Sequence, residues 1–298
     1  MLKKILKSTL HFIPQYSQFI TFSELGNYGR LGNQLFQYAF LRSYAIKNNI
    51  NLYLPYSNYN RLVDFNIECK YVDYRIIKLI DKKVVKELQF NFDEAYFNFY
   101  DRIDFQGYFQ TEKYFLNNRE LLLKELSLKD EKINDYCIDY LNKIRIKNNG
   151  LPIVALHIRR GDNVPSQTKY SDKTLGVFSP NKVNYHPLLS SDYINKAKSY
   201  FKEVVFLIFS DSAKDIKWCK KNIKGLRHEY SENHDDLTDF TLMRNCDHNI
   251  IANSSFSWWA AWLNNNKKQI VIAPKNWFGT AYENYDLKDL YPKSWRIH

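Results

Sequence analysis

Two adjacent arginines follow a short apolar segment near the middle of the chain. We expect Ile153–Ile158 to be a buried strand, and it overlaps the sequence His-Ile-Arg-Arg-Gly-Asp at residues 157–162. A guanidinium stays charged at neutral pH and presents a planar fork of N–H donors that matches phosphate oxygens. The pattern predicts a site for a ligand with phosphates, in which Arg159 is placed best. An ion pair that closes the sheet is the alternative interpretation.

Polar side chains also follow two other apolar segments that we expect to be strands. Residues 210–212 (Ser-Asp-Ser) come after Val204–Phe209, where they suit ribose hydroxyls or base edges and equally suit a plain helix N-cap. Ser254 and Ser255 come after Asn249–Ala252 and begin a tryptophan-rich helix. Because a helix N-terminus presents N–H groups and a partial positive charge, this position favours a phosphate. The tryptophans are expected to pack in the core.

A glycine-rich turn lies near the start of the chain. Three of the nine glycines, Gly26, Gly29 and Gly32, lie close together and are followed by Asn33. Clustered glycines indicate unusual backbone angles and close approach of a ligand. Their spacing does not match the GxGxxG fingerprint of dinucleotide-binding folds, and the sequence has no GxxxxGKS/T loop, so ATPase chemistry is not expected.

The expected strands and helices place these residues at the edges of parallel sheets. The second half of the chain alternates apolar strands with helical segments, which is typical of a parallel sheet covered on both faces. The first half opens with a strand at Phe19–Ser23, a helix over 34–47 and a strand at Asn51–Leu54. Ligands bind beyond the carboxyl ends of such strands. We expect an α/β protein with two Rossmann-like domains that face a cleft, at residues 1–150 and 151–298.

Composition and charge limit the function further. Of 298 residues, 45% are hydrophobic and 25% are charged, which is typical of a folded globular protein. The net charge of +11 favours a phosphate-bearing ligand or an anionic lipid, whereas basic residues spread along the whole chain make nucleic-acid binding unexpected. No apolar stretch approaches the roughly 18 residues that cross a bilayer. The four cysteines form no CxxC pair, which favours reduced thiols and a cytoplasmic location.

Residues 1–18 form an N-terminal extension with two interpretations. Leu2, Ile5, Leu6 and Ile13 recur at helical spacing, while lysines occupy another face. A basic amphipathic helix of this kind can rest on an anionic membrane, which would make the protein peripheral on the inner membrane face. An ordinary first helix that packs on its own domain is the alternative.

No two aspartates stand two positions apart anywhere in the sequence. An enzyme that breaks a sugar–pyrophosphate bond must stabilise the leaving diphosphate, and many such enzymes use a metal ion held by an Asp-x-Asp pair. In this chain the charge must come from arginine side chains and helix ends. The sequence therefore predicts a nucleotide-sugar site that needs neither a metal nor a cofactor.

Four segments together resemble the α-1,2-fucosyltransferases of glycosyltransferase family 11, in their bacterial form. Residues 29–38 are similar to the family's GGLGNQ(L/M)FQY segment, with Arg30 in place of the second glycine. Residues 157–162 resemble the HxRRGD motif that α-1,2-, α-1,6- and protein O-fucosyltransferases share. Residues 209–212 and 253–259 match two further blocks, and the four segments occur in the family's order.

The resemblance implies a GT-B fold with an acceptor-side N-terminal domain and a C-terminal domain that binds GDP-fucose. It implies inverting transfer of L-fucose from GDP-β-L-fucose to the 2-hydroxyl of a terminal galactose in a β-galactoside glycan. Arg159 would clamp the β-phosphate, His157 would orient the donor or that arginine, and Asn33 would lie near the reacting centre. The donor-binding residues implied in this way are Gly32, Asn33, His157, Arg159, Asp211, Ser254, Ser255 and Phe256.

The general base, the acceptor and the linkage have open alternatives. Asp162 is the carboxylate of the motif and a candidate base, but a salt bridge to Arg160 is the alternative, and a strongly dissociative transition state would leave a base little to do. The acceptor glycan can be lipid-linked, free or protein-bound. An α-1,6- or protein O-fucosyltransferase is an alternative to the α-1,2 linkage, although the block Ser257–Trp259 favours the α-1,2 group. A non-catalytic carbohydrate-binding protein would not need the paired arginines.

Overall fold

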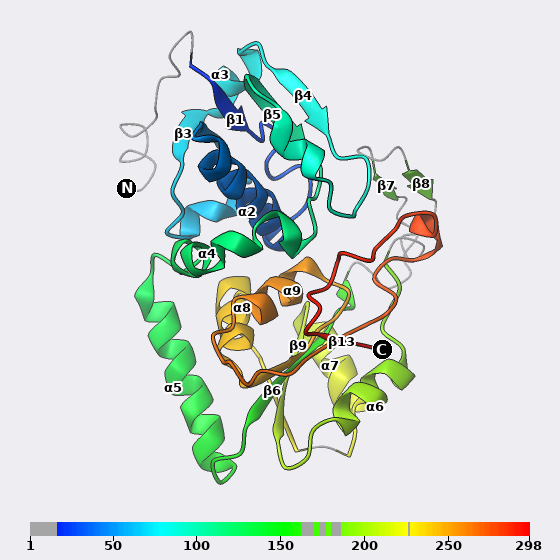
Figure 1. Cartoon of the computed structure of the whole chain (residues 1–298). Helices are drawn as coiled ribbons and strands as arrows, with labels where there is room; N and C mark the ends of the chain where they lie inside the picture. The colour runs from blue at the N-terminus through cyan, green and yellow to red at the C-terminus, as the bar shows by residue number, and fades with distance from the viewer. Residues whose placement is uncertain (1–16, 162–169, 173–176, 180–185, 226) are drawn as a thin grey trace. The chain divides into compact units, whose positions relative to one another are not determined.

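The computed structural model of the chain describes residues 17–161, 170–172, 177–179, 186–225 and 227–298. These residues form two compact units, each built on its own parallel sheet (Figure 1). Unit 1 extends to Lys129 and includes Tyr285–Pro292, whereas unit 2 consists of Asp130–Asn284 and Lys293–His298. The expected α/β class is confirmed.

Unit 1 has a five-stranded parallel sheet in the order β3-β2-β1-β5-β4. Its strands are β1 (Phe19–Thr21), β2 (Asn51–Tyr56), β3 (Lys70–Asp73), β4 (Lys83–Lys86) and β5 (Arg102–Gln106). Its helices are α2 (Leu31–Asn48), α3 (Tyr74–Leu79) and α4 (Arg119–Glu125), with 3-10 turns η1 (Arg61–Asp64), η2 (Glu94–Asn98), η3 (Glu112–Tyr114) and η4 (Leu116–Asn118). The strand order reverses between β1 and β5, so the segments that follow these two strands meet at one edge of the sheet.

Different helices cover the two faces of this sheet. On one face, Phe40 and Tyr44 of α2 pack edge-on against Phe105 of β5, with ring centroids 4.9 and 5.2 Å apart. Phe19 points to the other face, because it pairs with the first residue of β5 and successive side chains of a strand alternate. There it packs with Ile77 of α3. The many aromatic residues of the chain therefore serve largely as core.

Unit 2 has a six-stranded parallel sheet in the order β10-β9-β6-β11-β12-β13. Its strands are β6 (Ile153–Ile158), β9 (Val205–Ser210), β10 (His228–Tyr230), β11 (His248–Ile250), β12 (Val271–Ala273) and β13 (Arg296–Ile297). Its helices are α5 (Glu131–Lys147), α6 (Ser191–Ser199), α7 (Ala213–Asn222), α8 (Asp236–Asn245) and α9 (Ser255–Trp262), with the turn η7 (Thr280–Tyr282). A separate antiparallel pair is formed by β7 (Tyr170–Asp172) and β8 (Val177–Ser179). Counted along the chain, the six strands run 3-2-1-4-5-6, which is the Rossmann order.

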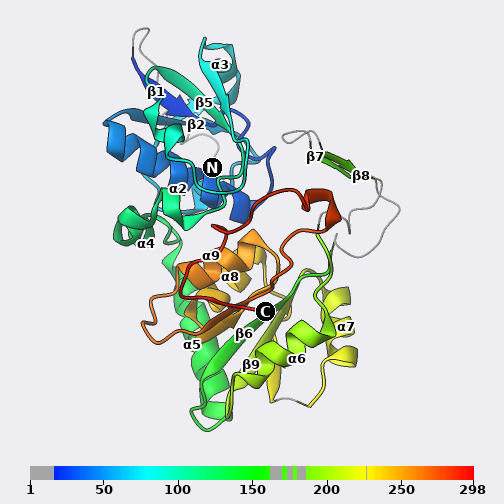
Figure 2. The same ribbon diagram turned by 45° about the vertical axis from the view of Figure 1, so that its right-hand side comes forward.

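Helices cover both faces of the unit 2 sheet (Figure 2). Helices α6 and α7 share one core with β6, β9 and β11, and α5, α8 and α9 lie together on the opposite face. The chain divides at Lys129 and Asp130, before the boundary expected at residue 150, because α5 packs against α8. The Cys137 thiol of α5, for example, contacts the Thr238 carbonyl at 3.6 Å.

Two expectations about membranes came from the sequence, and the structure tests only the first, that no segment spans a bilayer. In the described ranges no helix is both long and apolar enough to pass through a bilayer. Most of the N-terminal extension, residues 1–16, lies outside the described residues, so its amphipathic helix stays a prediction.

Candidate functional site

The order of the unit 2 sheet reverses between β6 and β11. These strands pair directly, with Val154 beside His248 and Leu156 beside Ile250. Open α/β sheets bind ligands outside the carboxyl ends of their strands at such a point. The structure therefore brings residues 157–161 and 253–257 to the same edge of one sheet.

Arg159 is held by a carboxylate from the neighbouring strand. Its Nη1 donates to Asp211 Oδ1 in an ion pair whose side chains are 19% and 12% exposed. The other oxygen, Oδ2, accepts the backbone N–H of Arg160 at 2.7 Å. Strand pairing sets Ile158 beside Ser210, so the two segments leave the sheet together. Asp211, expected at the nucleotide, thus orients the guanidinium, a role that the sequence did not indicate.

Gly161 lies against the same carboxylate. Its φ is +32°, in the region that favours glycine, and a Cβ at this position would come within 2.8 Å of Asp211 Cγ. The glycine of the motif therefore lets the chain turn closely past the Arg159–Asp211 pair.

The second arginine of the motif points into unit 2. The guanidinium of Arg160 lies 3.8 Å from the centroid of the Trp218 ring, and its Nε is 3.5 Å from Asp215 Oδ1. Ser212 caps α7, because its hydroxyl accepts the Asp215 N–H at 3.2 Å. The N-cap interpretation is therefore confirmed for Ser212. Asp162, the candidate base and the alternative partner of Arg160, lies outside the described residues.

His157 is an uncharged, buried residue beside this site. It is 4% exposed, and burial together with the nearby charge of Arg159 lowers the pKa of its imidazole to about 3. Its ring lies 6.2 Å from that of Phe256 on α9, and within the described part of the chain its Nδ1 has no hydrogen-bond partner. His157 can therefore orient neighbours by packing or hydrogen bonding, but it does not add positive charge near neutral pH.

The N-terminus of α9 lies across the sheet reversal. Ser254 is the N-cap, and its side chain makes no capping hydrogen bond. The first hydrogen bond of the helix runs from Trp258 N to the Ser254 carbonyl at 3.0 Å. The N–H groups of the first turn therefore take no part in the helical hydrogen-bond pattern. The amide of Asn253 donates to the Pro187 and Trp277 carbonyls at 2.9 and 3.2 Å and fixes the turn. This end suits an anion.

The tryptophans of α9 have the expected role. Trp258, Trp259 and Trp262 are 0%, 0% and 4% exposed, respectively, and pack on one another. Phe256 and Ser255, in the first turn, are partly exposed.

In unit 1 the glycine turn surrounds Asn33. Gly29 has a φ of +108°, and a Cβ there would overlap the Asn33 amide. Asn33 Nδ2 donates to the Tyr28 carbonyl at 3.1 Å, while its Oδ1 accepts from Gln110 Nε2 at 3.1 Å. Gly32 is buried in the first turn of α2. The amide of Asn33 is thus held in one orientation.

Gln110 comes from a loop after β5 that the sequence did not bring forward. Glu87 is buried, and its carboxylate accepts the N–H groups of Tyr108 at 2.6 Å and of Phe109 at 3.0 Å. This holds Phe109 at a φ of +52°, which is uncommon for a bulky residue and marks a constrained turn. A positive φ at phenylalanine has no sequence signal, so only the structure shows that this loop faces Asn33.

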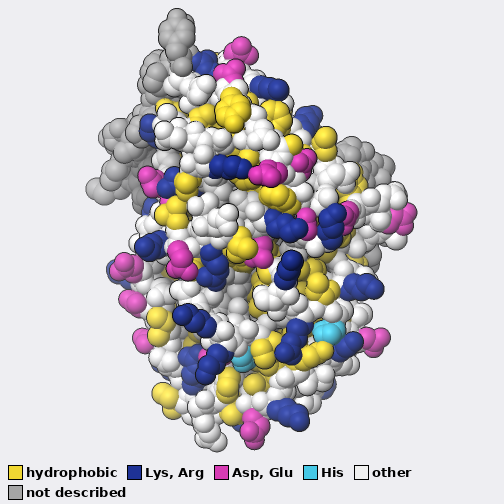
Figure 3. Space-filling model, viewed as in Figure 1, with side chains coloured by type: hydrophobic (Ala, Val, Ile, Leu, Met, Phe, Trp, Pro, Cys, Tyr) yellow, Lys and Arg dark blue, Asp and Glu magenta, His cyan; other side chains and the backbone are white. Residues whose placement is uncertain are grey.

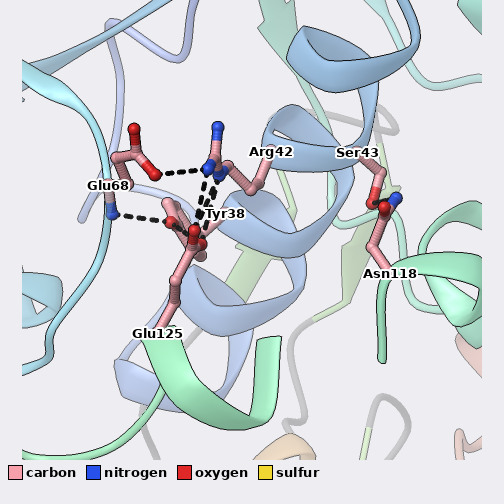
Figure 4. Close-up of polar contacts among 6 residues, drawn as sticks. All are labelled: Tyr38, Arg42, Ser43, Glu68, Asn118 and Glu125. Carbon is pink, nitrogen blue, oxygen red and sulfur yellow. Dashed lines mark hydrogen bonds and ion pairs between the residues drawn. The ribbon is translucent and has the colours of Figure 1, made fainter. Parts of the chain in front are cut away.

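Other polar side chains of α2 and of the turn before it fix this helix within unit 1. Figure 4 shows Tyr38 and Arg42 of α2 converging on Glu125 of α4. The Tyr38 hydroxyl donates to this carboxylate and accepts the Glu68 N–H at 3.0 Å, and Arg42 Nε donates to Glu125 Oε1 at 3.0 Å. Burial and the Glu125 charge raise the pKa of Tyr38 far above its ordinary value. Gln34 holds the turn before η1 by accepting the N–H of residue 61 at 2.8 Å. We assign these contacts to stability.

Two further features bear on charge. Arg30 is exposed and precedes α2 as its N-cap without a side-chain capping bond. No cluster of three or more His, Cys, Asp or Glu side chains able to hold a metal ion occurs among residues 17–161, 170–172, 177–179, 186–225 and 227–298.

Known proteins match most of the chain. The family model for Glycosyl transferase family 11 matches residues 7–297. The alpha-1,2-colitosyltransferase of Escherichia coli is 32% identical over 90% of this chain and 95% of that protein. The galactoside 2-alpha-L-fucosyltransferase Sec1 of Mus musculus is 27% identical over 79% of this chain, which spans 62% of that protein. The fucosyltransferase NodZ from Bradyrhizobium is 14% identical over 82% of this chain and 92% of that chain, with a TM-score of 0.48. The match of the family model over nearly the whole sequence shows that this chain belongs to glycosyltransferase family 11.

Proposed function

We propose that the chain transfers L-fucose from GDP-β-L-fucose to the 2-hydroxyl of a terminal galactose in a glycan, with inversion and without a metal. Membership of the family supports glycosyl transfer, and the names of the E. coli and mouse relatives support the α-1,2 linkage. The observation that carries the proposal is the Arg159 guanidinium, which Asp211 holds at the sheet reversal of unit 2.

Arg159 stabilises the leaving diphosphate in this proposal. Negative charge grows on the β-phosphate as the glycosidic bond breaks, and a donor that is already in position costs no reorganisation at that moment. Arginine presents five N–H donors in a planar fork, so a guanidinium that bonds Asp211 through Nη1 can also contact phosphate oxygens. The N-terminus of α9 adds partial positive charge from the other side of the reversal. Neutral His157 positions the donor or the arginine.

The proposal also gives Asn33 of unit 1 a role in substrate binding. Its amide is fixed by the Tyr28 carbonyl and by Gln110, so its orientation is set before substrate arrives. An amide in this position can hydrogen-bond the incoming hydroxyl without acting as a base. Asp162 remains the candidate for a base. The proposal includes a cytoplasmic location. It leaves open whether the acceptor glycan is lipid-linked or free.

Colitose is the second candidate donor sugar. The E. coli relative, named for colitose transfer, is matched over 95% of its length. Colitose lacks the 3-hydroxyl of fucose. A site built to hydrogen-bond that hydroxyl discriminates against the deoxy sugar by about 10⁴-fold or more, whereas an apolar site discriminates weakly against the extra hydroxyl. The ratio of kcat/KM for the two GDP-sugars therefore decides between them.

One experiment tests both parts of the proposal. The protein is supplied with GDP-fucose or GDP-colitose and a panel of β-galactosides in the presence of EDTA, and the product linkage is read by NMR. We expect transfer to the 2-hydroxyl despite the chelator. A 6-linked product, or activity that needs manganese, would contradict the proposal, and galactoside binding without affinity for GDP would favour a carbohydrate-binding protein.

A further inference from the structure

Helix α3 and strand β4 of unit 1 expose four large apolar side chains. The exposed fractions are 87% for Leu79, 50% for Ile76, 48% for Val84 and 39% for Tyr74. Ile76 and Leu79 are three positions apart on the helix and therefore neighbours, and Val84 follows on β4, at the edge of the sheet. Leu79 has the largest exposed fraction among the large hydrophobic residues of the described chain. Exposed apolar side chains that lie together mark interaction surfaces, whereas single exposed apolar side chains are common and need no explanation.

Basic side chains surround these apolar groups. Residues 70–86 contain six lysines and arginines against two aspartates. Arg75 and Lys86 are exposed, and exposed Lys83, next to Val84 on β4, lies 5.0 Å from the Phe99 ring centroid on the other face of the strand. Lys78 lies 4.7 Å from the Tyr74 ring centroid and is paired with Glu24. Figure 3 shows basic and hydrophobic side chains side by side over the region where Figure 1 draws α3 and β4. Counted together with Glu24, residues 70–86 have six positive and three negative side chains, so their net charge is positive.

The two aspartates offset only part of this charge, since six basic residues stand against them in residues 70–86. Asp73 accepts the N–H of Arg75 at 2.8 Å and caps α3, so its carboxylate serves the helix itself. Asp81 lies in the turn between α3 and β4, next to Lys82 and Lys83. Lys82 is 8% exposed and contacts the Ile77 carbonyl at 2.8 Å, so it belongs to the interior.

We propose that this α3–β4 surface docks on an anionic lipid bilayer. Exposed aliphatic groups that enter the headgroup boundary, an adjacent tyrosine and nearby basic side chains are the chemistry of interfacial binding. Each lysine near an anionic surface contributes about fivefold in affinity. A protein strand added to β4 is the competing occupant, and Lys83 and Lys86 oppose it because charged residues on an edge strand prevent pairing. The proposal is independent of the sugar that the protein transfers.

The test is co-flotation of the full chain with vesicles of phosphatidylcholine alone or with about one third phosphatidylglycerol, the composition that supplies the surface charge. We expect binding to the anionic vesicles, weakened by salt. The double variant Ile76→Ser, Leu79→Ser should bind about tenfold more weakly, since it loses two aliphatic groups. Lys83→Glu, Lys86→Glu should also lose at least about tenfold. Ile146→Ser is the matched control, because Ile146 is 80% exposed on α5 of unit 2.

Three results would overturn the proposal. The first is that the parent protein does not float with anionic vesicles. The second is that it binds neutral vesicles equally well. The third is that either double variant binds anionic vesicles as well as the parent does. The last result would assign membrane binding to another part of the chain. Circular dichroism of each variant establishes that it is folded, and surface substitutions of this kind change stability little.

Discussion

Replacing Asp211 by asparagine tests how the site holds its central charge. The carboxylate forms a charge-assisted bond with Arg159 Nη1 and accepts the Arg160 N–H, and both side chains of the pair are partly buried. A hydrogen bond to a charged group contributes about 1.5–3 kcal/mol, and asparagine can retain a neutral bond worth about 1 kcal/mol. Partial exposure reduces the difference further. We expect a net loss of about 0.5–2 kcal/mol in diphosphate binding, which is roughly 2- to 30-fold.

Calorimetry with GDP and with guanosine separates orientation of Arg159 from direct contact with the nucleoside. If Asp211 acts through Arg159, the Asp211→Asn variant loses affinity for GDP and keeps its affinity for guanosine. Asp215→Asn is the control, because Asp215 pairs with Arg160, and its GDP affinity should stay at the parental value. Tighter GDP binding by Asp211→Asn would refute the reasoning, since it would mean that the carboxylate competes with phosphate for the guanidinium.

Four further predictions concern other residues of the two units. Gly161→Ala should lower kcat/KM at least about tenfold in a transfer assay, because its methyl group would displace Asp211, and an unchanged rate would contradict the close packing. The pKa of His157 is about 3 in the folded protein, below its ordinary 6.5, so the unfolded chain binds an extra proton between these pH values. Stability therefore falls as pH decreases below 6.5. The variant His157→Gln should flatten the fall in Tm between about pH 7 and pH 5. Glu125→Gln should lower the free energy of unfolding in urea by about 3 kcal/mol and leave GDP affinity unchanged, whereas a loss of affinity would give that cluster a role in binding. Gln110→Leu should lower kcat with little change in GDP affinity, because it frees the amide of Asn33, and Gln110→Glu should do the same by reversing that amide; parental kcat in both would remove Gln110 from the site.

Regular apolar segments made the central strands of the second unit and the helices between them predictable from the sequence, whereas α5, β10 and β13 were not predicted. The strand expected at Ile153–Ile158 has those bounds, and the helix expected to begin at Ser255 begins there. Near-continuous apolar strands between amphipathic helices leave few alternatives to a parallel sheet. In unit 1, strand β5 was not predicted, because Asp104 interrupts its apolar pattern. The fold satisfies that carboxylate with the Ser23 N–H and hydroxyl at 2.8 and 2.6 Å, which is a tertiary contact.

The site was predictable only as far as single strand ends. Arg159, Ser254 and Ser255 could be placed at one sheet edge because parallel strands end together. The partner of Arg159 depends on a contact with Asp211, 52 positions away, and Gln110 meets Asn33 across 77 positions. Such pairings depend on strand order and on the turn at Phe109, which local sequence does not specify. Sequence reasoning therefore found the charged group and missed the residues that hold it.

The most direct test compares the single-turnover rate of fucosyl transfer by the parent and by Arg159→Ala with EDTA present. Loss of a preorganised donor at a developing oxyanion costs about 10²–10³ in rate. We expect a decrease of at least that size, with the parent fully active under chelation. A variant that transfers fucose at the parental rate, or a parent that requires added manganese, would contradict the role given to Arg159.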